Sequence, residues 1–100
     1  MEFLFTYGSL QWEQVQRELL HRKLTGYPDL LQGFRLMEEK TYGQYPVIRA
    51  CDNVLDKVAG IVYEVTKAEL QITDDYEGKD YLRIKTTLAS GKAAWVYVGK

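Results

Sequence analysis

The chain has 100 residues, which corresponds by length to one domain over residues 1–100. Hydrophobic residues make up 46% and charged residues 27%, a globular composition that excludes an intrinsically disordered chain. The 13 basic and 14 acidic side chains give a formal net charge of −1, and this near-balance argues against a nucleic acid as the main partner.

Apolar runs and cysteine content narrow the location that we expect. No apolar run approaches the roughly 18 residues of a membrane span. The sequence opens on a strand-like Phe3-Leu4-Phe5, without the basic flank or cleavage site of a signal peptide. The single cysteine, Cys51, excludes an internal disulfide framework. We therefore expect a cytoplasmic protein that contacts no membrane.

The first two expected elements are a strand over residues 2–6 and a long helix over residues 11–24. The strand is short, aromatic and β-branched at its end. Along the helix, apolar side chains recur every three or four residues, which predicts one buried stripe. The chain breaks at Gly8 before this helix, and Gly26 ends it.

The middle of the chain carries strand signals of mixed quality. A strand is predicted over residues 30–37, interrupted by Gly33, and a polar loop is predicted over residues 38–41. Pro46 cannot donate to a sheet ladder, so its segment is predicted to be an edge or a loop. A short strand is expected over residues 47–50.

The second half of the chain is more regular. Residues 58–65 alternate and are rich in β-branched side chains, which predicts a strand with Gly60 as a bulge or a site of close approach. Thr66 and Glu69 fit a capping box at the start of a short helix over residues 67–75, and Gly78 ends that helix.

Two final strands are predicted over residues 81–88 and 93–98, joined by a hairpin turn at Ser90-Gly91-Lys92. The elements show no regular βαβ alternation and no internal repeat. We therefore expect an α+β domain whose antiparallel or mixed sheet curls toward a small barrel.

One candidate site is Tyr7-Gly8-Ser9-Leu10, between the first predicted strand and the first predicted helix. Glycine allows a sharp turn and a close approach of the backbone to a ligand. The first amides of the helix are unpaired and, with the helix dipole, favour a carboxylate or a similar anion. The alternative is an ordinary strand-to-helix turn with Ser9 as the N-cap, and such turns are common.

The second candidate site is Asp74-Asp75-Tyr76-Glu77-Gly78, which puts three carboxylates at a helix C-terminus. The helix dipole disfavours anions there, and a locally unfavourable arrangement often marks a functional site. Mutual repulsion and partial burial would raise the pKa of one carboxylate, as a general base requires. The alternative is a solvated acidic helix end.

Three other side chains are weaker candidates for a functional role. Arg83 is expected on the next strand, where it pairs with Glu77 or Asp75, orients a substrate carboxylate, or lies on the surface. His21 falls on the polar side of the first helix, and Cys51 has no nearby His or Cys, so neither is assigned a role. No metal-ligand spacing, P-loop or dinucleotide fingerprint is present.

The order and spacing of these motifs resemble the gamma-glutamylcyclotransferase-like (AIG2-like) family, which includes the plant avirulence-induced proteins and short bacterial members. The resemblance spans Phe3 to Tyr97. The segments that carry it are Tyr7-Gly8-Ser9-Leu10, Tyr45-Pro46, Gly60-Ile61-Val62-Tyr63, Asp75-Tyr76-Glu77-Gly78 and Tyr81-Leu82-Arg83.

The resemblance implies a small mixed α/β barrel with the pocket at one mouth. It implies that Tyr7, Gly8, Ser9 and Leu10 hold a γ-glutamyl group through backbone amides, and that Glu77 is the catalytic acid/base. Beside Tyr7, Gly8, Ser9 and Leu10, the residues Tyr45 and Arg83 are further candidate substrate contacts.

The implied activity is conversion of a γ-glutamyl amide to 5-oxoproline and a free amine by attack of the substrate's own α-amine. The partner is then a small γ-glutamyl substrate, either a γ-glutamyl amino acid or a γ-glutamyl amine. No metal or organic cofactor is required, and a monomer or weak homodimer is expected. The alternatives are a non-catalytic module that binds a small carboxylate and, less favoured, an interaction scaffold that uses the abundant tyrosines.

Overall fold

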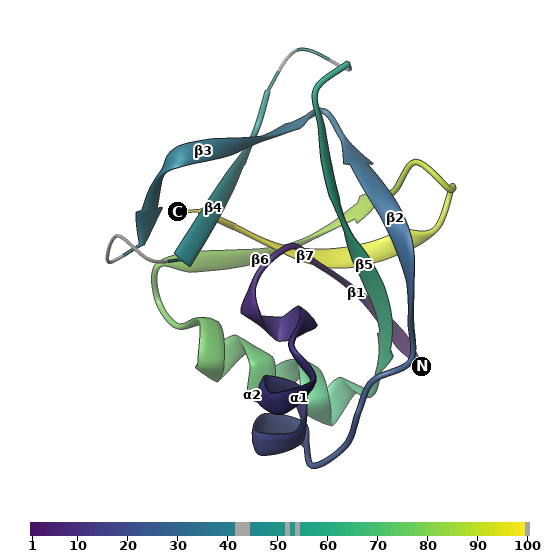
Figure 1. Cartoon of the computed structure of the whole chain (residues 1–100). Coiled ribbons are helices and arrows are strands. Elements are labelled where there is room, and N and C mark those ends of the chain that lie inside the picture. The colour runs from purple at the N-terminus through teal and green to yellow at the C-terminus, as the bar shows by residue number, and fades with distance from the viewer. Residues whose placement is uncertain (42–44, 52, 54, 100) are drawn as a thin grey trace.

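The computed structural model describes residues 1–41, 45–51, 53 and 55–99 of the chain. In this part of the chain α1 follows the first strand, α2 follows a run of four strands, and two strands come last (Figure 1). Their bounds are β1 Glu2–Thr6, a 3-10 helix Ser9–Gln11, α1 Glu13–Leu20, β2 Gly26–Gln32, β3 Phe34–Thr41, β4 Tyr45–Ala50, β5 Lys57–Val65, α2 Lys67–Glu77, β6 Tyr81–Thr87 and β7 Ala93–Gly99. The arrangement confirms the predicted α+β class.

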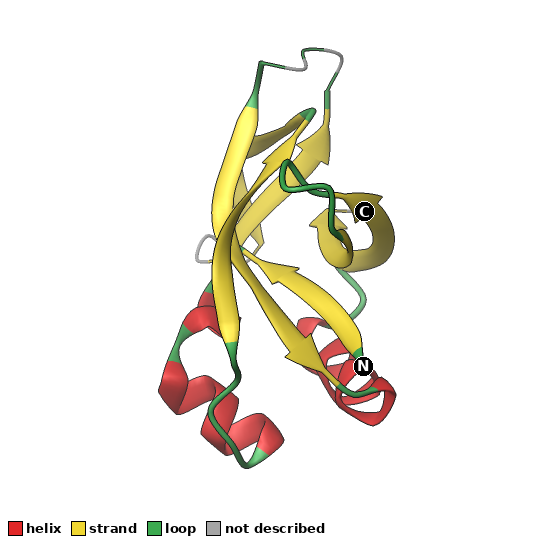
Figure 2. Cartoon of the chain, turned by 90° about the vertical axis from the view of Figure 1, so that its right-hand side faces the viewer, coloured by secondary structure: helices red, strands yellow, loops and turns green. Residues whose placement is uncertain are grey.

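Five strands form one mixed sheet in the order β2-β5-β1-β7-β6. Within this sheet β1 and β7 run parallel, and the other neighbouring strands run antiparallel. β3 and β4 form a separate antiparallel pair. Figure 2 shows both helices gathered at one end of the strands. The mixed sheet agrees with the prediction, but the described strands do not close into the expected barrel, because β3 and β4 leave the larger sheet.

Gly33 explains why the chain leaves that sheet. It has a φ of 80°, a left-handed conformation that favours glycine, and it separates β2 from β3. The single strand predicted over residues 30–37 is therefore wrong, since its two halves belong to different sheets. The loop predicted over residues 38–41 is wrong as well, because β3 continues to Thr41. The predicted edge position of Pro46 is confirmed, since β4 pairs with β3 alone among the described strands.

The first helix is shorter than the sequence predicts. Trp12 has an extended backbone that separates the 3-10 helix from α1, and His21 ends α1 with a left-handed φ of 62°. The buried side chain of Gln16 stabilises this arrangement: its Nε2 donates to the carbonyl of Leu10 at 2.8 Å, and its Oε1 accepts from the amide of Leu24 at 2.9 Å. These bonds satisfy backbone groups at both ends of the helical segment. With 8 residues against 11 in α2, α1 is the shorter helix, which corrects the expected order of lengths.

The second helix begins and ends where the sequence signals predict. Thr66 and Glu69 form the complete capping box. Gly78 follows the helix with a φ of 78°, and its amide donates to the carbonyl of Asp74 at 3.0 Å. The helix runs two residues beyond the predicted end at residue 75, so Glu77 is its last residue.

The core lies on both faces of β1, because alternate side chains of a strand point to opposite sides. Leu4 packs in a cluster with side chains from α1, α2 and β7, while Phe5 packs in a second cluster with side chains from β2, β3 and β4. Gly60 on β5 lies so close to β1 that a Cβ would overlap the backbone carbonyl of Thr6. The predicted close approach at Gly60 is thus confirmed, and it holds the strand that leads into the first candidate site.

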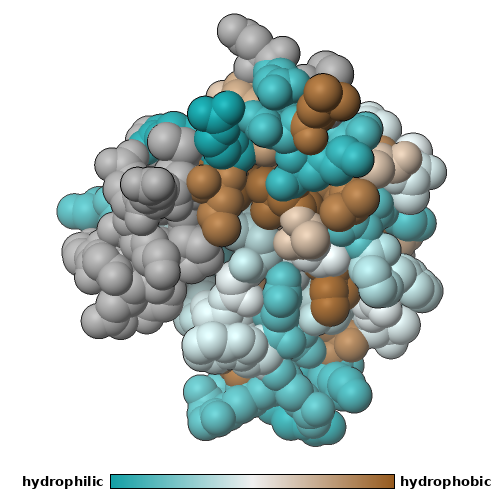
Figure 3. All heavy atoms as spheres, turned by 45° about the horizontal axis from the view of Figure 1, so that its top comes forward, coloured by the Kyte–Doolittle hydropathy of each residue, from teal (hydrophilic) through white to brown (hydrophobic). Residues whose placement is uncertain are grey.

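None of the described helices is long and apolar enough to cross a membrane. On the face drawn in Figure 3, hydrophobic side chains lie in several groups bordered by hydrophilic ones. This face is therefore mixed in character rather than uniformly apolar.

Candidate active site

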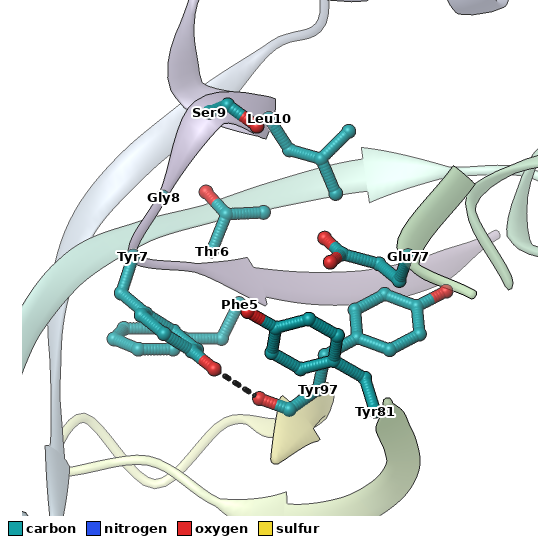
Figure 4. A pocket seen from close by; sticks show the side chains of 9 residues that line it. All are labelled: Phe5, Thr6, Tyr7, Gly8, Ser9, Leu10, Glu77, Tyr81 and Tyr97. Carbon is teal, nitrogen blue, oxygen red and sulfur yellow. Dashed lines mark hydrogen bonds between the residues drawn. The ribbon is translucent and has the colours of Figure 1, made fainter. Parts of the chain in front are cut away.

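A pocket lies where the end of β1 and the following loop face the C-terminus of α2 (Figure 4). It contains about 360 Å³ of empty space, part of which is open to solvent. This volume is at the lower end of the roughly 300–1,000 Å³ typical of small-molecule sites. The residues that line it are Phe5, Thr6, Tyr7, Gly8, Ser9, Leu10, Glu77, Tyr81 and Tyr97. The two motifs that the sequence singled out therefore meet in one pocket.

The loop that lines this pocket carries backbone amides without protein partners, but its setting differs from the one that the sequence predicts. Gly8, Ser9 and Leu10 form no hydrogen bond through their N–H groups within the described part of the chain. They precede a 3-10 helix, and α1 begins only at Glu13. The expected position at the mouth of a long helix is therefore wrong, and any anion binding here depends on the amides themselves rather than on the dipole of α1.

Several hydrogen bonds hold the loop in place. The Tyr7 hydroxyl donates to the backbone carbonyl of Tyr97 at 2.5 Å, and Gln11 Nε2 donates to the carbonyl of Thr6 at 2.8 Å. Ser9 does not act as an N-cap, because its Oγ lies 2.8 Å from the Tyr76 hydroxyl on α2. Burial raises the pKa of Tyr7, so its hydroxyl stays protonated and remains a donor. The loop is therefore fixed both to β7 and to α2.

Glu77 directs its carboxylate into the pocket from the end of α2 (Figure 4). Burial raises the pKa of Glu77 from 4.5 to about 7. Within the described part of the chain this carboxylate has no hydrogen-bond or ion-pair partner. A carboxylate with a pKa near neutrality and no fixed partner is suited to accept and return a proton.

The other two acidic residues of the motif do not point their carboxylates into this pocket as Glu77 does: neither is among the residues that line it. Asp74 forms an ion pair with Arg83, with 2.9 Å between Oδ1 and Nε, and its Oδ1 also accepts from the Tyr97 hydroxyl at 2.6 Å. Asp75 is exposed. The prediction of one raised pKa in this cluster agrees with the structure. Of the two predicted causes, burial accounts for it, and repulsion between the carboxylates does not contribute.

Two predicted substrate contacts do not join this pocket. Arg83 was expected to pair with Glu77 or Asp75, or to orient the substrate, yet it pairs with Asp74 and stacks on Trp95, 4.4 Å from the ring centroid. It lines a neighbouring recess instead. The structure describes the backbone of Tyr45 but not its side chain, so its role stays a prediction.

Sequence reasoning missed Tyr81 and Tyr97, which form the wall opposite the loop. Tyr81 follows Glu77 by four residues, after the turn at Gly78, and this proximity was an available signal. Tyr97 reaches the pocket because β7 pairs in parallel with β1, with Phe5 opposite Val96. Such a parallel contact between the first and last strands is non-local and leaves no short sequence signature.

Comparison with known proteins supports this reading of the motifs. Residues 4–100 match the family model described as "Gamma-glutamyl cyclotransferase, AIG2-like". The chain belongs to this family. A protein of Methanocaldococcus jannaschii whose name begins "Gamma-glutamylcyclotransferase" is 31% identical over 99 residues, which is 95% of this chain and 44% of that protein. The chain therefore spans less than half the length of this curated relative.

Several longer solved chains share the fold. The solution structure of an Arabidopsis thaliana protein is 30% identical, has a TM-score of 0.84, and matches over 98% of this chain and 61% of its own. A second Arabidopsis thaliana solution structure is 28% identical, with a TM-score of 0.82 over 98% of this chain and 68% of its own. A structure named gamma-glutamyl cyclotransferase is 22% identical, with a TM-score of 0.73 over 99% of this chain and 66% of its own, and that likeness concerns the fold alone.

Proposed function

We propose that this member of the family converts a γ-glutamyl amide to 5-oxoproline and a free amine. The observation that carries the proposal is the partly buried carboxylate of Glu77, whose pKa is raised to about 7 and which shares a pocket with the Gly8–Leu10 loop. Within the described part of the chain, neither this carboxylate nor the loop amides have a protein partner. Family membership supports the same reaction class.

Glu77 supplies the proton transfers in this scheme. The substrate's α-ammonium gives a proton to the Glu77 carboxylate, and the resulting amine attacks the γ-carbonyl carbon to close a five-membered lactam. The C–N bond to the leaving amine then breaks as the proton held by Glu77 passes to the departing nitrogen. The ring nitrogen gives up its second proton to the freed amine, so that the lactam is neutral and the amine leaves as an ammonium. One carboxylate thus serves as base and then as acid, and its pKa near 7 suits both steps.

The loop holds the substrate in an attacking shape. The nucleophile is tethered to the carbonyl, so the main gain comes from orientation. The amides of Gly8, Ser9 and Leu10 are available either to the α-carboxylate or to the oxyanion that forms on the γ-carbonyl oxygen. The rings of Tyr81 and Tyr97 close the opposite wall, which limits water around Glu77.

The test is release of 5-oxoproline from a panel of γ-glutamyl amino acids and γ-glutamyl amines. We expect Glu77→Gln to keep the fold and lose nearly all turnover, because an amide cannot accept the ammonium proton. Asp75→Asn is the matched control: it also removes one carboxylate from the motif, but at an exposed position, and should retain activity. A Glu77→Gln variant as active as the parent overturns the role of Glu77.

A failure of the reaction itself has a different signature. If the folded parent protein releases no 5-oxoproline from any substrate, while 5-oxoproline or γ-glutamyl compounds raise its melting temperature, the pocket is a binding module for a small carboxylate. That result would replace the cyclotransferase proposal.

A further inference from the structure

Tyr97 connects the two sides of the Glu77 pocket by hydrogen bonds. Its hydroxyl donates to Asp74 Oδ1 at 2.6 Å and lies 2.7 Å from Thr73 Oγ1, and both partners belong to α2. Its backbone carbonyl accepts from the Tyr7 hydroxyl at 2.5 Å (Figure 4). Thr73 and Asp74 precede Glu77 by four and three residues, so they share a face of the helix with it. The position of Glu77 relative to the loop is therefore set in part through Tyr97.

Asp74 depends on Arg83 for its place in this arrangement. Asp74 is a carboxylate in the last turn of α2, where the helix dipole disfavours an anion. Arg83 on β6 offsets this cost, since its Nε lies 2.9 Å from Asp74 Oδ1. The guanidinium carbon of Arg83 also lies 4.4 Å from the centroid of the Trp95 ring on β7. The same oxygen of Asp74 thus accepts from Arg83 and from the Tyr97 hydroxyl, and Arg83 holds it in place.

The ion pair also balances the charge beside Glu77. Side chains three positions apart on a helix are neighbours, so an unpaired Asp74 carboxylate would repel that of Glu77. Arg83 supplies the opposing charge, and Asp75 is exposed to solvent. None of the described residues of α1 lines the pocket. The other titratable groups that line it are phenols, which ordinarily ionise near pH 10, from Tyr7, Tyr81 and Tyr97.

We propose that Arg83 and Asp74 are positioning residues for the proton transfers of Glu77: Arg83 holds the Asp74 carboxylate, and Asp74 holds the Tyr97 hydroxyl that aligns α2 with the loop. The inference rests on the proposed cyclotransferase function and deepens it, because it assigns the side chains that keep the base in place and in a balanced electrostatic environment. Neither residue of the pair has to touch the substrate for this role.

The pH dependence of kcat for 5-oxoproline release separates this role from plain stabilisation of the fold. Arg83→Gln leaves the Asp74 carboxylate unbalanced and should move the midpoint of the pH profile upward by about half a pH unit. Asp74→Asn leaves the Arg83 guanidinium unbalanced and should move the midpoint downward. The double variant lacks both charges, so its midpoint should return to that of the parent. Arg83→Lys keeps the charge and should keep the midpoint of the parent.

The maximal kcat of the same proteins tests the alignment. Each single variant, and also Tyr97→Phe, should lower kcat roughly tenfold with little change in KM, because the loop amides remain available to the substrate. The double variant of Arg83 and Asp74 should lose no more than the weaker of the two single variants, since the residues act as a unit.

The matched control is Arg35→Gln, which breaks another arginine ion pair, with Asp56 at 2.8 Å, on β3 outside the pocket. It should leave kcat and the midpoint unchanged. Equal midpoints in the parent and both single variants, or losses of kcat that add in the double variant, overturn the proposal and leave the pair a structural role. Should Arg83→Gln fail to fold, the downward shift in Asp74→Asn, or its absence, decides alone.

A failure of the proposed function has a separate signature. If the parent protein releases no 5-oxoproline, NMR titration of the Glu77 carboxyl carbon in the parent and the same variants measures the midpoint without turnover. Opposite shifts in Arg83→Gln and Asp74→Asn then support the role of the pair, and identical midpoints overturn it.

Discussion

The Ser9 Oγ and the Tyr76 hydroxyl lie 2.8 Å apart and join the pocket loop to α2, one residue before Glu77. The partners are 67 positions apart in the sequence. Together with the bond from the Tyr7 hydroxyl to the carbonyl of Tyr97, this contact sets the position of the loop amides relative to the Glu77 carboxylate. Tyr76 is therefore a positioning residue in our account, and its hydroxyl can be tested alone.

Tyr76→Phe should raise the KM for a γ-glutamyl substrate about three- to tenfold, since a net hydrogen bond contributes roughly 0.5–1.5 kcal/mol. The melting temperature should change little, because the bond is exposed. Tyr27→Phe is the matched control, since it removes an exposed tyrosine hydroxyl that donates to Glu64 at 3.2 Å on β5, away from the pocket. Equal KM values for both variants would show that the Tyr76 hydroxyl does not position the loop.

The raised pKa of Glu77 predicts a dependence of stability on pH. Its folded-state pKa of about 7 lies above the ordinary value of 4.5, so the folded protein binds the proton more tightly than the unfolded chain. The free energy of unfolding should fall as the pH rises from about 4.5 to 7 and then level off. Glu77→Gln lacks this loss and should be more stable than the parent at pH 8 by up to about 3 kcal/mol, at 1.36 kcal/mol per pKa unit.

Urea denaturation of both proteins at pH 4 and pH 8 measures this difference, with Asp75→Asn as the exposed control. Near pH 4 the parent and Glu77→Gln should have similar stabilities, because Glu77 is then protonated in both the folded and the unfolded state. If the difference in stability between the two proteins is the same at both pH values, Glu77 ionises near its ordinary pKa. That result would contradict the claim that burial raises its pKa in the folded protein.

Gln16 gives a prediction about the fold that holds the loop. It is 2% exposed and binds the carbonyl of Leu10 and the amide of Leu24. Gln16→Leu keeps a similar volume but leaves both backbone groups without this partner, so we expect a loss of roughly 2–4 kcal/mol in the free energy of unfolding. Gln14→Leu, on the exposed side of the same helix, should change it by less than about 0.5 kcal/mol. Chemical denaturation compares the two, and equal losses would contradict the role of Gln16.

Local signals in the sequence predict the elements that depend on local chemistry. The capping box at Thr66, the end of α2 at Gly78 and the alternating strand β5 are found in this way, because caps, turns and side-chain periods act over a few residues. The length of the first helix is predicted wrongly. Gln16 lies among polar residues in the sequence, yet its side chain is buried and bonds to the backbone of Leu10 and Leu24. A polar side chain that satisfies distant backbone groups gives no periodic signal.

The residues of the candidate site likewise fall into those found by contiguous motifs and those that depend on tertiary contacts. The loop and the acidic end of α2 are predicted because each is a contiguous motif, whereas the choice of Glu77 among the three carboxylates comes from the family resemblance alone. Tyr97 is missed because it enters the pocket through the parallel pairing of β1 with β7, and the partner of Arg83 is missed because it depends on how β6 lies against α2. Both are tertiary contacts between segments that the sequence alone does not place side by side.

The most direct test of the account is the pH dependence of 5-oxoproline release by the parent protein and by Glu77→Gln. We predict that kcat of the parent rises through a pH of about 7, where Glu77 becomes ionised, and that Glu77→Gln stays nearly inactive at every pH. A Glu77→Gln variant that releases 5-oxoproline at the rate of the parent, with the same pH profile, would contradict the central claim that Glu77 carries the proton.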